Sequence, residues 1–166
     1  MKATSKEPNL KAFQVLISES AMKNQFDEAF FFLNEMKKFS VTPDHFIYES
    51  LSLSLMKNGR IEEGLEYLKS LISQSTLNIY EYNSYISVLI DNNRIKEAYN
   101  LFSDLKKKNI EPNHFTFHEL IANSMKIGDL EEVDRLFQEM RDFGLEPDTK
   151  LFKSLLEEKQ ITIKQK

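Results

Sequence analysis

The sequence predicts an all-α fold: an α-solenoid of four helix-turn-helix repeats followed by a C-terminal capping helix. The main observation is a pattern that recurs every 34 or 35 residues, starting at Leu10, His45, Ile79, His114 and Thr149. Aromatic residues, and residues that tolerate a left-handed backbone, stand at fixed places within each period. A single helical hairpin cannot cover its own apolar face, so successive hairpins are expected to stack and share a core.

The fourth position of the repeat is always aromatic, and the seventh is always large and apolar. The fourth positions are Phe13, Tyr48, Tyr82, Phe117 and Phe152, and the seventh positions are Leu16, Leu51, Tyr85, Leu120 and Leu155. Apolar residues three and four apart, such as Tyr82, Tyr85 and Ile86, are typical of one helix face. These side chains are therefore expected to form the core rather than a cofactor site.

The first helix of each repeat is expected to run from about the fourth position to a turn at the fifteenth. That position holds Asn24, Gly59, Asn93 and Gly128, residue types that end helices by adopting a left-handed backbone. A second helix should begin at Phe26, Ile61, Ile95 and Leu130 and end near Met36, Leu71, Leu105 and Met140. A proline turn follows three of the four second helices, since proline cannot continue a helix.

The repeat pattern predicts the organisation of the chain. The expected segments are an N-terminal tail (1–9), repeats at 10–44, 45–78, 79–113 and 114–148, a capping helix (149–160) and a basic tail (161–166). The second repeat is the most divergent, because it is one residue shorter and ends without proline. The capping helix should place Phe152, Leu155 and Leu156 inward.

Composition limits the classes of function. Hydrophobic residues make up 41% and charged residues 29% of the chain, as in folded soluble proteins. No cysteine is present, which excludes disulfides, thiolate metal sites and cysteine nucleophiles. The apolar runs are too short to span a membrane. Residues 10–149 contain 15 Lys and Arg against 23 Asp and Glu, a net charge of −8, while the tails carry +4. An anionic partner would therefore have to meet a local basic patch or a tail.

The segment His114–Asp148 reads "HFTFHELIANSMKIGDLEEVDRLFQEMRDFGLEPD" and resembles the pentatricopeptide repeat, as do its period and its Pro-Asp or Pro-Asn ending. The resemblance covers Leu10 to about Glu157. A tetratricopeptide repeat would need small residues at the eighth and near the twenty-seventh position. Three of the eighth positions are isoleucine, and the twenty-seventh are methionine or leucine, so that family does not fit.

The resemblance implies that the fifth and last residues of each repeat flank one unpaired RNA base and read its edge, with one repeat per base. The candidate base-reading pairs are Gln14 with Asp44, Glu49 with Asn78, Asn83 with Asn113, and His118 with Asp148. The family pattern fits the asparagine pair best and implies a pyrimidine there. The residue after the proline also suits a helix N-cap. The two readings are compatible, and both stay open.

In the same family, the second position packs against base faces and the thirteenth often binds phosphate. The resemblance therefore makes Phe46, Tyr80 and Phe115 base-stacking candidates, and Lys57 and Lys126 phosphate-contact candidates. The alternative for the aromatic residues is packing between adjacent repeats. Lys106–Lys108 and the tail Lys159–Lys166 are further candidates for electrostatic contact with RNA, although such runs are commonly only solvated.

The resulting hypothesis is a non-catalytic module that binds a short single-stranded RNA within a larger organellar ribonucleoprotein. Four repeats would read about four nucleotides, so protein subunits of the complex are expected to supply further affinity. The alternative is a protein–protein scaffold or structural subunit, for example of a mitochondrial ribosome, with little base readout. The run "AFFFLNEM" (Ala29–Met36) favours this alternative if Phe30 or Phe31 is exposed, whereas contact with a neighbouring hairpin would explain it otherwise.

An enzyme is not expected, because the chain has neither a glycine-rich phosphate loop nor a His-x-x-x-His pair supported by further ligands. We accordingly expect no catalytic residue, metal, cofactor, membrane or small-molecule substrate. The resemblance implies a mitochondrial location, although the N-terminus lacks the arginines of a transit peptide. The motif Glu7–Asn9 repeats Glu111–Asn113, which suggests a missing upstream hairpin and a first helix with one uncovered side. The protein alone is therefore expected to self-associate or precipitate.

Overall fold

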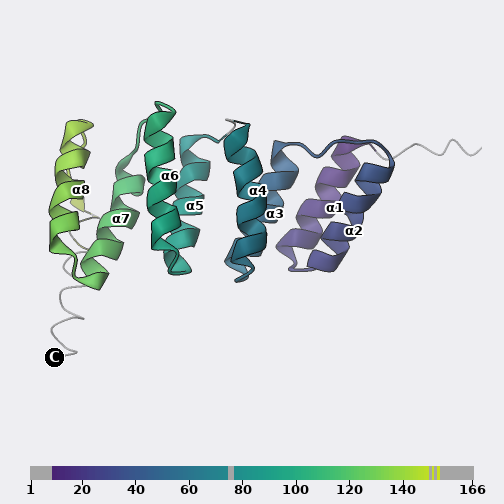
Figure 1. The fold of residues 1–166 in the computed structure, drawn as a ribbon, viewed down its shortest axis with the longest axis horizontal. Helices are drawn as coiled ribbons and strands as arrows, with labels where there is room; N and C mark the ends of the chain where they lie inside the picture. Colours follow the sequence, from purple (N-terminus) through teal and green to yellow (C-terminus); the bar gives the residue numbers. More distant parts are fainter. Residues whose placement is uncertain (1–8, 75–76, 150, 152, 154–166) are drawn as a thin grey trace, which may run out of the picture. The chain divides into compact units, whose positions relative to one another are not determined.

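The computed structural model describes residues 9–74, 77–149, 151 and 153, and this part of the chain contains eight α-helices in four hairpins (Figure 1). The chain divides into two compact units, one ending at Leu77 and the other beginning at Asn78. The first unit holds α1 (Leu10–Met22), α2 (Phe26–Lys38), α3 (His45–Lys57) and α4 (Ile61–Ser73). The second holds α5 (Ile79–Asp91), α6 (Ile95–Lys107), α7 (His114–Ile127) and α8 (Leu130–Asp142).

The all-α fold of paired helices is confirmed. The second helix of every hairpin begins at the residue expected from the sequence, while the first helix begins three positions earlier than expected. The reason is local: the residue just before each first helix has a side chain that accepts a backbone N–H of the first turn. Such a cap supplies a partner for one of the free N–H groups at a helix start, so the helix can begin at once.

The expected left-handed turns are present in all four hairpins. The backbone φ angle is 61° at Asn24, 78° at Gly59, 58° at Asn93 and 78° at Gly128. Asparagine and glycine are the residues that reach this region at the lowest cost. The turn lets the second helix fold back after only two or three residues.

The core of the first unit includes a cluster of side chains from α1, α2 and α3. Its buried members include Phe13, Ile17, Leu33, Met36 and Leu51. Gly64 of α4 lies so close to α3 that an added Cβ would sit 2.9 Å from the Ser52 carbonyl oxygen. The Ser52 hydroxyl also donates to the Gly64 carbonyl at 2.7 Å. At this position the hairpin therefore has room only for glycine.

The second unit has an equivalent core, in which the expected aromatic side chains are buried. Tyr82 and Phe117 are fully buried, and the Phe102 and Phe117 rings meet edge to face with centroids 5.6 Å apart. That contact joins α6 to α7 and so links the two hairpins of the unit. The Tyr82 hydroxyl donates to Asp104 Oδ2 at 2.6 Å, and burial together with this bond raises the pKa of Tyr82 above its usual range.

Two side chains expected in the core are only partly covered. Leu16 is 41% exposed, although Leu51 and Leu120 at the same repeat position are fully buried. Tyr48 is half-buried and lies beside Tyr67, with ring centroids 6.0 Å apart. The difference at Leu16 has a simple cause: α3 packs on α1 and α7 packs on α5 within their units, whereas the described residues of the first unit cover this side of α1 with no other helix.

Only the start of the expected capping helix falls within the described residues. Asp148 Oδ1 accepts the backbone N–H of Leu151 at 2.8 Å, and Leu151 is buried. Phe152, Leu155, Leu156 and the basic tail lie outside the described residues. Among the helices that are described, none has both the length and the apolar character needed to cross a membrane.

Candidate nucleic-acid interface

A polar residue just before each first helix caps that helix throughout the described chain. The side chain of Asp44 accepts the N–H of Ile47 at 3.2 Å, and that of Asn113 accepts the N–H of Thr116 at 3.1 Å. Asn9, Asn78 and Asp148 do the same for the helices that follow them. One oxygen of each capping residue is thus fixed by a backbone N–H, which also fixes where its other side-chain atom points.

The candidate base-reading pair Asn83 and Asn113 is brought together in the second unit. Asn83 Nδ2 donates to Asn113 Oδ1 at 3.1 Å. Asn83 is 5% exposed, whereas Asn113 is half-buried. The fifth residue of α5 and the cap of α7 therefore form one polar site at the boundary between core and surface.

The pair Gln14 and Asp44 is brought together in the first unit in the same way. Gln14 Nε2 donates to Asp44 Oδ2 at 2.5 Å, while Asp44 Oδ1 serves as the cap of α3. Both residues are half-buried. This pair differs chemically from the asparagine pair, because a carboxylate can only accept hydrogen bonds.

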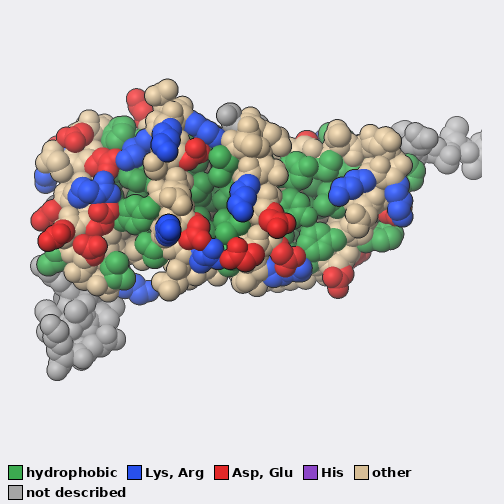
Figure 2. All heavy atoms as spheres, viewed as in Figure 1, with side chains coloured by type: hydrophobic (Ala, Val, Ile, Leu, Met, Phe, Trp, Pro, Cys, Tyr) green, Lys and Arg blue, Asp and Glu red, His purple; other side chains and the backbone are tan. Residues whose placement is uncertain are grey.

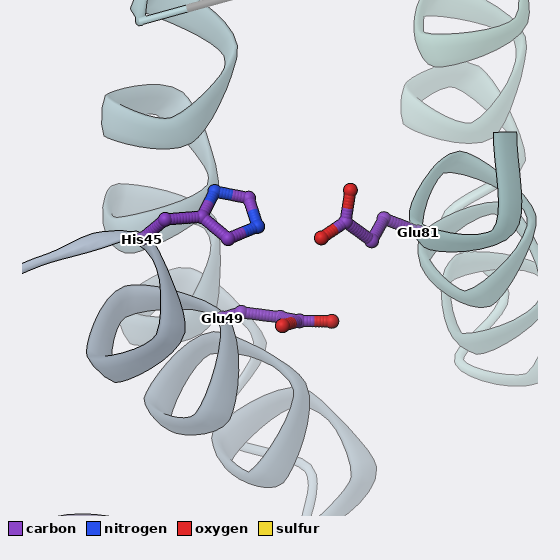
Figure 3. A group of neighbouring side chains, drawn as sticks. All are labelled: His45, Glu49 and Glu81. Carbon is purple, nitrogen blue, oxygen red and sulfur yellow. The ribbon is translucent and has the colours of Figure 1, made fainter. Parts of the chain in front are cut away.

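The remaining candidates are placed as follows. Glu49 projects from α3 on the same side as His45, which lies one turn earlier in the helix (Figure 3). Asn78 belongs to the second unit, where it forms a reciprocal capping box with Glu81, the α5 residue that Figure 3 also shows. His118 Nδ1 lies 3.7 Å from Glu119 Oε1, and the exposed Asp148 caps the turn of Leu151.

The three aromatic candidates are exposed. Phe46 is 45%, Tyr80 75% and Phe115 42% exposed, each in the first turn of a first helix. The phosphate-contact candidates Lys57 and Lys126 are also exposed, each in the last turn of its helix.

The lysine run on α6 differs from the expectation of free basic side chains. Lys106 forms an ion pair with Glu139 of α8, and its ammonium lies 4.3 Å from the centroid of the Phe102 ring. Lys108 pairs with Asp104 at 3.4 Å. Lys106 therefore joins α6 to α8, Lys108 pairs within the end of its own helix, and Lys107 is the exposed member of the run.

Sequence reasoning missed one residue of the site, Thr116. Its hydroxyl donates to Asn83 Oδ1 at 2.7 Å and accepts the backbone N–H of Asn113 at 3.1 Å. The spacing Asn-x-x-Thr, which resembles a capping box, was the available signal. The contact to Asn83, 33 residues away, had no signal in the sequence.

An apolar surface on the first hairpin is the other candidate functional feature. Val15, Leu16 and Met22 of α1 are 49%, 41% and 69% exposed, and Phe31 of α2 is 57% exposed. Phe39, just after α2, is 47% exposed. Figure 2 shows hydrophobic side chains at the surface of this hairpin. Phe30 is only partly exposed, because it packs against the core of the unit; the Arg60 guanidinium lies 5.4 Å from its ring centroid. We call these five exposed residues the α1–α2 apolar surface.

Comparison with known families identifies the repeat. The family model described as "PPR repeat" matches residues 12–41 and 115–145, and the model "PPR repeat family" matches residues 77–124. Together these matches cover more than half of the chain. The chain belongs to the PPR repeat family. Residues 42–76, which lie between the matches, contain most of the divergent second repeat.

Relatives and solved structures of PPR proteins agree with this assignment. A mitochondrial 15S rRNA processing factor, ppr3 of Schizosaccharomyces japonicus, is 22% identical over 143 residues, which are 84% of this chain and 21% of that protein. A chloroplastic pentatricopeptide repeat-containing protein of Arabidopsis thaliana is 25% identical over 111 residues, which are 64% of this chain and 14% of that protein. The chain thus spans about a fifth or less of the length of these relatives.

The solved structures show the same fold. The crystal structure of PPR10 from maize matches with a TM-score of 0.81 and 22% identity, over 92% of this chain and 22% of that one. PPR10 in complex with an 18-nucleotide psaJ RNA element matches with a TM-score of 0.68 and 23% identity, over 95% of this chain and 23% of that one. At this identity the likeness supports the fold of paired helices.

Proposed function

We propose that this PPR protein binds a short segment of single-stranded RNA without catalysing a reaction, as part of a larger organellar ribonucleoprotein. The observation that carries the proposal is the Asn83–Asn113 pair, hydrogen-bonded at 3.1 Å, on helices whose first turns expose Tyr80 and Phe115. A polar pair that can meet a base edge, with aromatic rings available for base faces, is what recognition of unpaired RNA requires. PPR10, whose fold the chain resembles, has been crystallised with RNA.

The energetics indicate modest affinity. A base stacked on an exposed ring can contribute roughly 1–3 kcal/mol. The electrostatic part is small, because residues 10–149 carry a net charge of −8 and two phosphate-contact lysines are proposed. Two neutralised phosphates of a single strand give a slope of log K against log salt of only about −1.4. Partner subunits would therefore have to supply further affinity.

The proposal is tested by fluorescence anisotropy with labelled single-stranded RNA at low salt. Asn83→Ala and Tyr80→Ala should each weaken binding, because one removes polar contacts to the base and the other a stacking platform. Asn100→Ala is the matched control, since Asn100 is an exposed asparagine on α6 of the same unit. Equal affinity for all four proteins would refute the proposed interface. The base-reading roles of the other three pairs stay predictions.

The proposed location is mitochondrial. It is supported by relatives that are named as mitochondrial or chloroplastic proteins. Fractionation of cells that express the protein with an unmodified N-terminus would test it: recovery within protease-protected organelles is expected, and recovery only in the cytosolic fraction would contradict it.

The α1–α2 apolar surface favours a second candidate function, in which another protein subunit packs on the first hairpin. This surface has several large hydrophobic side chains that are about half exposed, among them Val15, Leu16 and Phe31. Exposed apolar groups of this kind are typical of protein–protein contacts. This role agrees with a structural subunit of a large assembly, such as a mitochondrial ribosome. Light scattering over a range of concentrations provides the test. The isolated protein should self-associate, and Phe31→Asp should reduce this, while a monodisperse wild-type monomer would count against the surface.

A further inference from the structure

Thr116 stands at the centre of the polar site, although it belongs to neither position of the base-reading pair. It is the third residue of α7, and its side chain is fully buried. Its hydroxyl oxygen lies 2.7 Å from Asn83 Oδ1 and 3.1 Å from the backbone nitrogen of Asn113. The backbone N–H of Thr116 in turn donates to Asn113 Oδ1 at 3.1 Å.

The direction of every bond in this cluster follows from two backbone N–H groups, which can only donate. The N–H of Thr116 requires an oxygen, so Asn113 must turn Oδ1 toward it and Nδ2 away. Asn83 must then present Nδ2 to Asn113 Oδ1, because two facing oxygens would repel. The N–H of Asn113 uses a lone pair of the Thr116 hydroxyl. The hydroxyl proton is therefore free for Asn83 Oδ1, the nearer of its two possible acceptors.

The groups left over are mainly donors. Asn113 keeps both hydrogens of its Nδ2, and Asn83 keeps one. Both amide oxygens are already engaged by protein donors, one by the Thr116 hydroxyl and the other by its backbone N–H. The pair therefore offers three donor hydrogens to a ligand, against one remaining lone pair on Asn83 Oδ1.

We infer that Thr116 is a positioning residue: its hydroxyl occupies the Asn83 amide oxygen, holds the Asn83–Asn113 pair as a hydrogen-bond donor, and so favours cytosine and uracil over adenine at this site. The inference rests on the proposed RNA-binding function. Cytosine offers two adjacent acceptors on its Watson–Crick edge, and uracil offers two carbonyl oxygens. Adenine offers a single ring acceptor next to an amino group, so one of the donors at the site would be left without a partner.

The first unit provides an internal comparison. The residue equivalent to Thr116 on α3 is Ile47, which is fully buried and has no side-chain donor. The pair at that place is Gln14 with Asp44, whose carboxylate can only accept. A hydroxyl at the third helix position thus accompanies the asparagine pair and is absent from the pair with a carboxylate. This difference fits a role for Thr116 in setting polarity rather than in capping α7 alone, since Asp44 caps α3 without it.

Thr116→Val tests the inference, because valine has nearly the same shape and lacks the hydroxyl. Asn83 Oδ1 then has no protein donor, so this oxygen is free to accept a hydrogen bond from the amino group of adenine. Affinities of the full chain for oligocytidine, oligouridine and oligoadenosine of equal length would be measured by anisotropy at low salt. The wild type should prefer the pyrimidines, and Thr116→Val should reduce that preference about three- to tenfold, the value of one net hydrogen bond. Thr116→Ser should restore it.

The outcomes separate the two claims. If the wild type binds none of the RNAs, the proposed function fails, and the inference fails with it. If the wild type prefers pyrimidines and Thr116→Val keeps the same preference, the inference alone is overturned. A direct measurement on the wild-type chain covers the case in which the valine variant does not fold. Exchange of the Asn83 side-chain amide hydrogens, followed by NMR, should be much slower than that of exposed Asn100; equal rates would show that the amide is not held and would overturn the inference.

Discussion

Leu51 of α3 and Leu16 of α1 occupy the same position of the repeat in strongly different surroundings. Replacing each by alanine therefore makes the same chemical change at a buried and at a partly exposed site. Leu51 is fully buried in the core of the first unit, whereas Leu16 is 41% exposed. Truncating a fully buried leucine typically lowers the free energy of unfolding by about 2–5 kcal/mol, because transfer free energy is lost and a cavity remains. At Leu16 the three deleted carbons are only partly buried and solvent fills the space. The transfer part, at about 0.8 kcal/mol per carbon scaled to three fifths burial, is then about 1.4 kcal/mol.

Urea unfolding followed by far-UV circular dichroism would measure both variants against the wild type at one low protein concentration. An unchanged dependence of the free energy on urea would show that both variants unfold from the same structure. Leu51→Ala should lose clearly more stability than Leu16→Ala. Equal losses would refute the reasoning, because they would mean that the α1 face is covered in solution as completely as the corresponding face of α3.

Three further predictions concern the hairpins. Gly64→Ala should lower stability despite the higher helix propensity of alanine, because the new Cβ overlaps Met56 and overpacking costs about 1–3 kcal/mol; a stabilised variant in thermal unfolding would contradict the close packing. Gly128→Ala should cost about 1–2 kcal/mol through its φ of 78° alone, since no atom lies within 4 Å of the added Cβ; an unchanged melting temperature would argue against the left-handed turn. Hydrogen bonds from Arg135 lower the pKa of Glu132 below its ordinary 4.5. The pair should therefore contribute stability above pH 4.5 and lose this contribution as the pH falls further. Arg135→Gln should make the melting temperature fall less steeply on acidification, and an unchanged dependence of melting temperature on pH would contradict this.

The sequence was sufficient to predict the features that depend on local chemistry. The starts of the second helices follow from the turn residues Asn24, Gly59, Asn93 and Gly128, because backbone conformation is set by the residue itself. The family and the fold class followed from the repeat period. The first helices begin three residues before the expected position, because each start is set by the capping residue and not by the first buried aromatic side chain.

Features that depend on contacts between distant residues could not be predicted from the pattern. Thr116 donates a hydrogen bond to Asn83, which is 33 residues away in the sequence, and Lys106 pairs with Glu139 at the same sequence separation. No local rule connects these residues, and the exposure of Leu16 depends on which helices surround it. Position in the repeat therefore predicts where a side chain lies in the hairpin, whereas its hydrogen-bond partners depend on how the hairpins pack.

In the proposed function, RNA lies along α5 and α7 and contacts the aromatic residues of their first turns. Ultraviolet crosslinking of bound single-stranded RNA, followed by mass spectrometry of the attached peptides, tests this claim most directly. The crosslinks should fall on peptides that contain Tyr80 and Phe115 of α5 and α7. Crosslinks confined to α6 and α8 would contradict the account, because they would place the RNA on the second helices instead.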